Sequence, residues 1–125
     1  MVAAFIDDGY TETAHVAAAA GVYPAISFRF RPVTAGEFSE YAHRLESSNA
    51  AETKQVTAEF VVGKLIDWDV RSGDGSKVAI TVENVLKLKH VVYLKLFQIV
   101  IGDEPSDAND NGHRAEIVPE TDLKN

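Results

Sequence analysis

The chain has 125 residues, of which 46% are hydrophobic and 25% charged, and this is the size and composition of one domain with its own core. Its net charge of −7 argues against DNA or RNA binding, because phosphate contacts need a basic surface. The absence of cysteine excludes disulfides, thiol nucleophiles and thiolate metal sites. No apolar run reaches the ~18 residues that a membrane span needs, so we expect no membrane contact.

Two strand-like runs near the N-terminus predict a β-hairpin. They cover residues 11–16 and 25–31, and the segment between them contains Gly21 and Pro24, which favour a turn. In the second run phenylalanine alternates with arginine, so the two kinds of side chain should lie on opposite faces of the strand. A nucleic-acid site would need aromatic and basic groups together to stack bases and bind phosphates. The pattern instead favours phenylalanines in the core.

The arginines of this run, Arg29 and Arg31, are the candidate partner-binding residues. Alternation places them opposite Phe28 and Phe30, where they face either solvent or the surface of another protein. Pro32 should end the strand, because proline cannot donate a hydrogen bond to a neighbouring strand.

Helix start signals follow the hairpin. Thr34 and Glu37 have the spacing of a capping box, and the helix that begins there should end near Ser47. A second helix should begin at Asn49, which can cap it. Apolar residues then cover nearly every side of the helical wheel as far as Trp68, which is typical of a central helix packed from several directions.

The remaining elements complete an α+β prediction with three main helices. An Asp-Gly turn at residues 71–76 and a short strand at 77–80 suggest a small second hairpin. Residues 81–102 are predicted as the third helix, from a threonine cap to a glycine that suits a left-handed end. After Gly102 the periodicity stops, and residues 103–125 contain seven acidic and two basic side chains. We therefore expect one domain at 1–102 and a flexible acidic tail at 103–125.

No metal site is predicted. Residues 107–112 imitate the first half of a calcium loop, but the twelfth position, which needs a bidentate glutamate, is Val118. The four histidines lie in separate segments and lack the spacing of a zinc-binding helix: His15, His43, His90 and His113.

No catalytic or cofactor site is predicted either. Asp67 and Asp69 flank Trp68, and we expect them to point outward around a buried indole rather than to form an acid/base pair. The glycines at residues 73 and 75 lack the lysine and following helix of a phosphate-binding loop. A small hydrolase or metal-dependent enzyme is thus the least favoured class, and a non-enzymatic protein is expected.

The order of these signals resembles a family of small proteins from tailed-phage and prophage tail modules, the tail assembly chaperone-like proteins. The resemblance rests on an aromatic-Arg-Pro strand within 21–32, a helix with Glu37 and Tyr41, a Trp-Asp-Val pattern at 65–70, and an Ile-Thr-x-Glu-Asn pattern at 80–84. It covers roughly residues 9–102. It departs at Lys89-His90, where the resemblance leads us to expect Leu-Pro.

The resemblance implies a non-enzymatic helper made in the cytoplasm of the host bacterium, without cofactors. Such proteins coat the long, helix-rich tape-measure protein and recruit tail-tube subunits, and a homo-oligomer is compatible with that role. The alternative within the same system is a structural virion component, either a tail-tube or a head-tail joining subunit.

Overall fold

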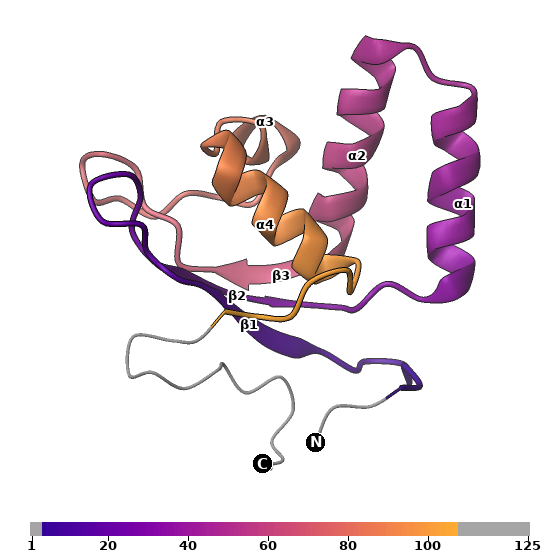
Figure 1. The fold of residues 1–125 in the computed structure, drawn as a ribbon, viewed down its shortest axis with the longest axis horizontal. Coiled ribbons are helices and arrows are strands. Elements are labelled where there is room, and N and C mark those ends of the chain that lie inside the picture. The colour runs from indigo at the N-terminus through magenta and orange to yellow at the C-terminus, as the bar shows by residue number, and fades with distance from the viewer. Residues whose placement is uncertain (1–3, 108–125) are drawn as a thin grey trace.

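The computed structural model describes residues 4–107, which form an α+β fold as expected (Figure 1). The elements in chain order are β1 (Glu12–Val16), β2 (Ile26–Phe30), α1 (Ala35–Glu46), α2 (Ala50–Lys64), β3 (Leu65–Trp68), α3 (Val82–Val85) and α4 (His90–Val100). The described helices lie on one side of the sheet, and α1 stands beside α2 at the end away from α3.

The sheet has three antiparallel strands in the order β1-β2-β3. The predicted hairpin is confirmed as β1 and β2, and Gly21 has the positive φ of 77° that its turn requires. Phe28 lies opposite Ala14 on one side and Trp68 on the other, so these three side chains share the face that meets the helices. Phe28 and Phe30 are 2% and 1% exposed, which confirms that the phenylalanines of this strand enter the core.

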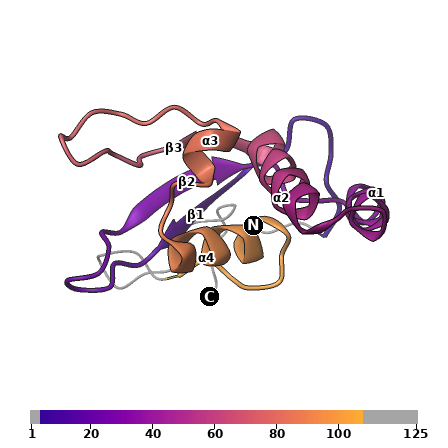
Figure 2. The same cartoon turned by 90° about the horizontal axis from the view of Figure 1, so that it is seen from above.

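One hydrophobic core joins the sheet to α2, α3 and α4. Figure 2 shows the arrangement of these helices and the three strands from above. The helix α4 lies across β1, whereas α3 contacts α2. The buried core residues are Ala14, Val16, Ile26, Phe28, Phe30, Ala58, Val61, Leu65, Trp68, Val85, Val92, Leu96, Ile99 and Val100. Because α1 contributes none of them, this helix must be held in place by contacts with α2 and α4.

The second helix ends earlier than predicted. It stops at Lys64, and the next residues form β3, so the expectation of a helix as far as Trp68 is wrong. The backbone N–H of Leu65 still donates to carbonyls of the last helical turn, so the chain passes from helix to strand without a loop. Pairing with β2 decides the conformation here, because an apolar run fits a buried helix and a buried strand equally well.

The predicted third helix is divided into a single turn, α3, and the longer α4. The chain is extended at Lys89, where ψ is 142°. The break falls at Lys89, and α4 begins at the next residue, His90. The division lets α3 pack on α2 while α4 crosses the sheet.

The small hairpin between β3 and α3 is a turn with one β-bridge, between Arg71 and Lys77, and no strand forms at residues 77–80. The tip is held by the Asp74 carboxylate, which accepts hydrogen bonds from the hydroxyls of Ser72 and Ser76. Those hydrogen bonds, with Ser72 the first cause, hold the pKa of Asp74 well below its usual range. The predicted Asp-Gly turn is therefore present, but its expected second strand is not.

The fold continues past the expected domain boundary at Gly102. Ser106 is 2% exposed and Asp107 bonds to β1, so both residues belong to the folded part of the chain rather than to the predicted tail. The rest of that tail, and with it most of the calcium-like segment, lies outside the described residues. Within residues 4–107, no helix is both long and apolar enough to cross a membrane.

Candidate functional site: a protein-binding surface on the helices

Helices α1 and α2 form a helical hairpin, and each of them begins with a capping box. Thr34 Oγ1 accepts from the Glu37 N–H at 3.1 Å, and the Glu37 carboxylate accepts from the Thr34 N–H at 3.0 Å. The same exchange joins Asn49 and Glu52 at 2.9 and 3.0 Å. Both caps were predicted from residue spacing, because capping is a local interaction that needs no tertiary contact.

An ion pair joins the first turn of α1 to the last turn of α2. Lys64 Nζ donates to Glu37 Oε1 at 2.7 Å, with the lysine side chain 11% exposed and the glutamate side chain 44% exposed. The hydrogen bond from Lys64, followed by that from the Thr34 backbone, lowers the pKa of Glu37. The pair is asymmetric, since the buried lysine depends on its partner more than the half-exposed glutamate does.

Glu37→Gln should lower the free energy of unfolding by about 1–2 kcal/mol, less than for a fully buried pair because solvent screens Glu37. Lys64→Met should cost less, since it removes the buried charge together with the pair. Both can be measured by urea denaturation followed by circular dichroism. Equal losses in the two variants would contradict the asymmetry.

The pH dependence of the stability difference between the wild type and Glu37→Gln provides the control. Since the folded state lowers the pKa of Glu37, its contribution is complete above the unfolded value of 4.5 and is lost as the pH falls through the folded value. The stability gap between wild type and Glu37→Gln should therefore close progressively below pH 4.5.

An aromatic cluster joins α1, α2 and α4 at the middle of the hairpin. Tyr41 stacks on Phe60 with ring centroids 4.3 Å apart and an interplanar angle of 12°. Its ring also contacts Phe38 at 5.8 Å and Phe97 at 6.2 Å, and its hydroxyl shares a hydrogen bond with Thr57 at 2.8 Å. We call Phe38, Tyr41, Phe60 and Phe97 the aromatic seam. Tyr41 is its centre, and it is 6% exposed.

The aromatic seam reaches the surface at one end. Phe38 is 41% exposed on α1, and on α4 Leu94, one turn before Phe97, is 42% exposed. Val91, one turn further back, is 51% exposed. Large exposed apolar side chains that form a contiguous patch are typical of a protein-binding surface, whereas isolated ones are common on any protein. Phe38 is linked to α4 through Tyr41 and Phe97 of the seam. The candidate site is thus the exposed end of the seam with Leu94 and Val91.

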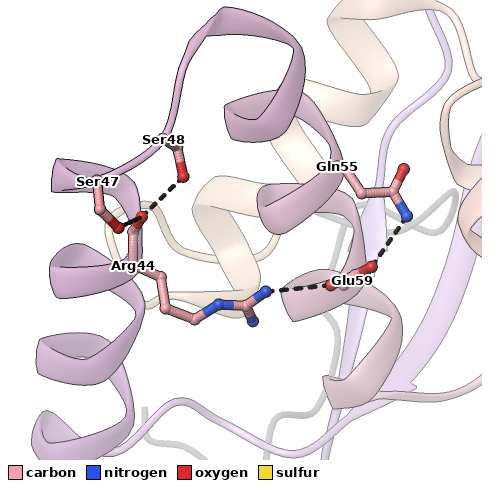
Figure 3. A network of polar contacts seen from close by, with 5 residues as sticks. All are labelled: Arg44, Ser47, Ser48, Gln55 and Glu59. Carbon is pink, nitrogen blue, oxygen red and sulfur yellow. Dashed lines mark hydrogen bonds and ion pairs between the residues drawn. The ribbon is translucent and has the colours of Figure 1, made fainter.

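A polar network closes the far end of the helical hairpin (Figure 3). Arg44 donates to Glu59 at 3.3 Å, and Gln55 donates to the other oxygen of the same carboxylate at 2.9 Å. The hydroxyls of Ser47 and Ser48 donate to the Arg44 carbonyl at the end of α1. These exposed contacts contribute little stability each, but they fix the register of the two helices that carry the seam.

The predicted partner-binding residues lie on a different face. Arg29 stands between Thr13 and Asp67 in the register of the sheet, on the side opposite Phe28, and both Arg29 and Arg31 are exposed. Asp67 also pairs with Lys77 at 3.7 Å. The structure therefore confirms the predicted exposure of the arginines but does not bring them together with the aromatic seam.

Charge reversal at both positions, Arg29→Glu with Arg31→Glu, should weaken binding of a protein partner about tenfold, or about 1.4 kcal/mol. The fold should be unaffected, with a stability change within about 0.5 kcal/mol, because both side chains are exposed. Unchanged affinity in a pull-down titration would show that the two arginines do not bind the partner and only increase solubility.

The residues considered as catalytic or metal-binding candidates do not form a site within residues 4–107. Asp67 is 63% exposed beside its lysine, and Asp69 accepts from the Ser27 N–H at 2.8 Å, while Trp68 between them is buried. The two carboxylates therefore flank the indole as expected. Across residues 4–107, no three His, Asp or Glu side chains gather as a metal site, and His113 lies outside the described residues.

The sequence analysis named Tyr41 in the first helix but did not identify the seam. Its other members, Phe60 and Phe97, come from different elements, and no spacing rule links them. Comparison of the chain with protein-family models, with curated proteins and with solved structures finds no match. The function is therefore inferred from the residues and geometry of this chain.

Proposed function

We propose that this protein is a non-enzymatic helper of phage or prophage tail assembly that binds the tape-measure protein in the cytoplasm of the host bacterium. The observation that carries the proposal is the aromatic seam, which joins three helices and has an exposed apolar residue on either side of it: Phe38 on α1 and Leu94 on α4, one turn before Phe97. The resemblance in strand, helix and turn signals supplies the biological setting.

The surface chemistry suits a helical partner. An amphipathic helix presents apolar side chains at every third and fourth residue, and it binds best to an apolar surface formed between helices. Phe38 on α1 and Leu94 on α4 offer two such contacts, and the Phe38 ring is backed by Tyr41, which itself stacks on Phe60. The tape-measure protein implied by the resemblance is long and rich in helix, and it would offer such faces.

The adjoining polar side chains would limit the contact to a transient one. Glu37, whose side chain is 44% exposed, directly precedes Phe38, so a charged side chain borders the apolar surface there. Transient interfaces combine an apolar centre with a polar rim, and they release their partner more readily than obligate ones do. A tail-assembly helper must release the tape-measure protein in this way, together with the tail-tube subunits it recruits.

The runner-up function is a structural virion component, such as a tail-tube or head-tail joining subunit. The sheet face that carries Arg29, which no described helix covers, would suit a subunit packed permanently against neighbours. Mass spectrometry of purified particles and of the infected lysate separates the two roles. A helper should be present in the lysate and absent from particles, whereas stoichiometric amounts in particles would overturn the proposal.

A further inference from the structure

A pocket of about 660 Å³ lies between the β1–β2 turn, the segment that follows β3 and the start of α4. Its lining includes residues 22–26, 69–72 and 87–89, with Val92 of α4. Ile26 and Val92 are buried, so the interior of the pocket is apolar. We call it the loop pocket. Its volume is within the range of about 300–1,000 Å³ that is usual for ligand-binding pockets.

Hydrogen bonds hold the walls of the loop pocket in place. Lys89 Nζ donates to the Val22 carbonyl, which ties the start of α4 to the β1–β2 turn. The Asp69 carboxylate accepts from the Ser27 N–H at 2.8 Å, which ties the segment after β3 to β2. Because each wall is fixed by bonds within the chain, the pocket is formed before any ligand binds.

The charged residues that line the loop pocket are mostly basic. Three are basic and one is acidic, and all four are exposed: Arg71, Lys87, Lys89 and Asp69. Lys87 lies 3.7 Å from Glu83, but their side chains are 71% and 79% exposed, so solvent screens this pair. In a chain with a net charge of −7, this is a local excess of positive charge. An apolar interior with a basic rim complements a segment that is both apolar and acidic.

The chain contains such a segment after the described residues. Residues 116–120 read Glu-Ile-Val-Pro-Glu, with two apolar side chains between two acidic ones. We propose that this segment docks into the loop pocket of its own chain, with Ile117 and Val118 against the apolar lining and the two glutamates beside the basic rim. This inference concerns a surface separate from the aromatic seam and does not depend on the tail-assembly proposal.

The end of the described chain lies within reach of the loop pocket. The Asp107 carboxylate is 2.9 Å from Lys95 Nζ, and Lys95 follows Val92 of the pocket lining by three residues, about 4.5 Å along α4. Ile117 is ten residues beyond Asp107, and ten extended residues span up to about 33 Å. A tether of this kind gives the segment an effective concentration in the millimolar range, which favours it over a free peptide of the same chemistry.

The test is paramagnetic broadening in the NMR spectrum of the full chain. Because the chain has no cysteine, Thr121→Cys can carry a nitroxide label at a single site, next to the proposed segment. The backbone amide signals of Val22 and Leu88 in the loop pocket should lose intensity, whereas that of Gln55 on α2 should not. Reduction of the nitroxide should restore the lost intensity.

Two variants of the labelled chain test the charge of the rim. Lys87→Glu places a negative charge at the pocket and should abolish the broadening at Val22 and Leu88. Lys54→Glu makes the same change in charge at an exposed position of α2 and should leave the broadening as it was. Both lysines are exposed, so the circular dichroism of both variants should be native.

Three results would overturn the proposal. The first is a labelled chain in which Val22 and Leu88 keep their full intensity. The second is the same outcome for Lys87→Glu and Lys54→Glu, whether both keep the broadening or both lose it. The third comes from a mixture of nitroxide-labelled chain without ¹⁵N and unlabelled chain with ¹⁵N. Broadening of the pocket signals in that mixture would show that the segment docks into a second copy rather than into its own chain.

Discussion

Replacing Trp68 by alanine should lower the free energy of unfolding by about 3–5 kcal/mol, the range for truncating a large buried aromatic side chain. Trp68 is 3% exposed in β3 and lies opposite Phe28 in the sheet. Its indole N–H donates to the Val78 carbonyl at 2.7 Å, which ties the segment before α3 to the core. The variant removes both the packing and this bond. Circular dichroism during urea denaturation should follow the loss, because the chain has no second tryptophan to report by fluorescence.

Two matched variants separate the contributions. Trp68→Phe keeps most of the apolar volume and leaves the Val78 carbonyl without the indole donor, so it should cost about 1–3 kcal/mol. Asp67→Ala changes the preceding residue, which is 63% exposed, and should cost less than about 1 kcal/mol. If Trp68→Ala were no more destabilising than Asp67→Ala, β3 would not be part of the core.

The double variant Phe38→Glu/Leu94→Glu should weaken binding to a tape-measure helix at least about 100-fold, or about 2.8 kcal/mol. Both side chains belong to the exposed apolar surface at the aromatic seam, and a docked helix would bury the new carboxylates without partners. The fold should persist, since each residue is more than 40% exposed. Titration of a labelled tape-measure peptide, followed by fluorescence anisotropy, measures the change.

A control with the same change in charge comes from two exposed apolar residues in the N-terminal part of the chain. Phe5 and Val22 are 75% and 52% exposed and lie outside the seam. Phe5→Glu/Val22→Glu should therefore leave the affinity within about twofold of the wild type, a difference under about 0.5 kcal/mol. Equal weakening by the two double variants would show that net charge, not the apolar surface, governs binding.

Local chemistry explains what could be predicted from the sequence. Thr34 and Asn49 were located as caps because each interacts with a residue three positions away, and the caps formed as predicted. The alternation of phenylalanine and arginine around Arg29 is also a local pattern, and it correctly predicted that the phenylalanines lie in the core. Each of these expectations depends on neighbours within one element.

Long-range pairing explains what could not be predicted from the sequence. The residues of β3 are apolar enough to continue α2, and only the partner strand β2 makes them extended. The best local indication that this segment is a strand was the alternation of Asp67, Trp68 and Asp69, which is typical of a half-buried strand. Similarly, nothing in residue spacing brings Phe97 to Tyr41, or Ser106 to β1, because these contacts join elements far apart in the chain.

Co-expression with the tape-measure protein of the same genome tests the proposed function most directly. The wild-type chain should co-purify with the tape-measure protein and raise its soluble yield, while Phe38→Glu/Leu94→Glu should do neither and Phe5→Glu/Val22→Glu should match the wild type. A tape-measure protein that neither co-purifies with the wild-type chain nor gains solubility from it would contradict the account.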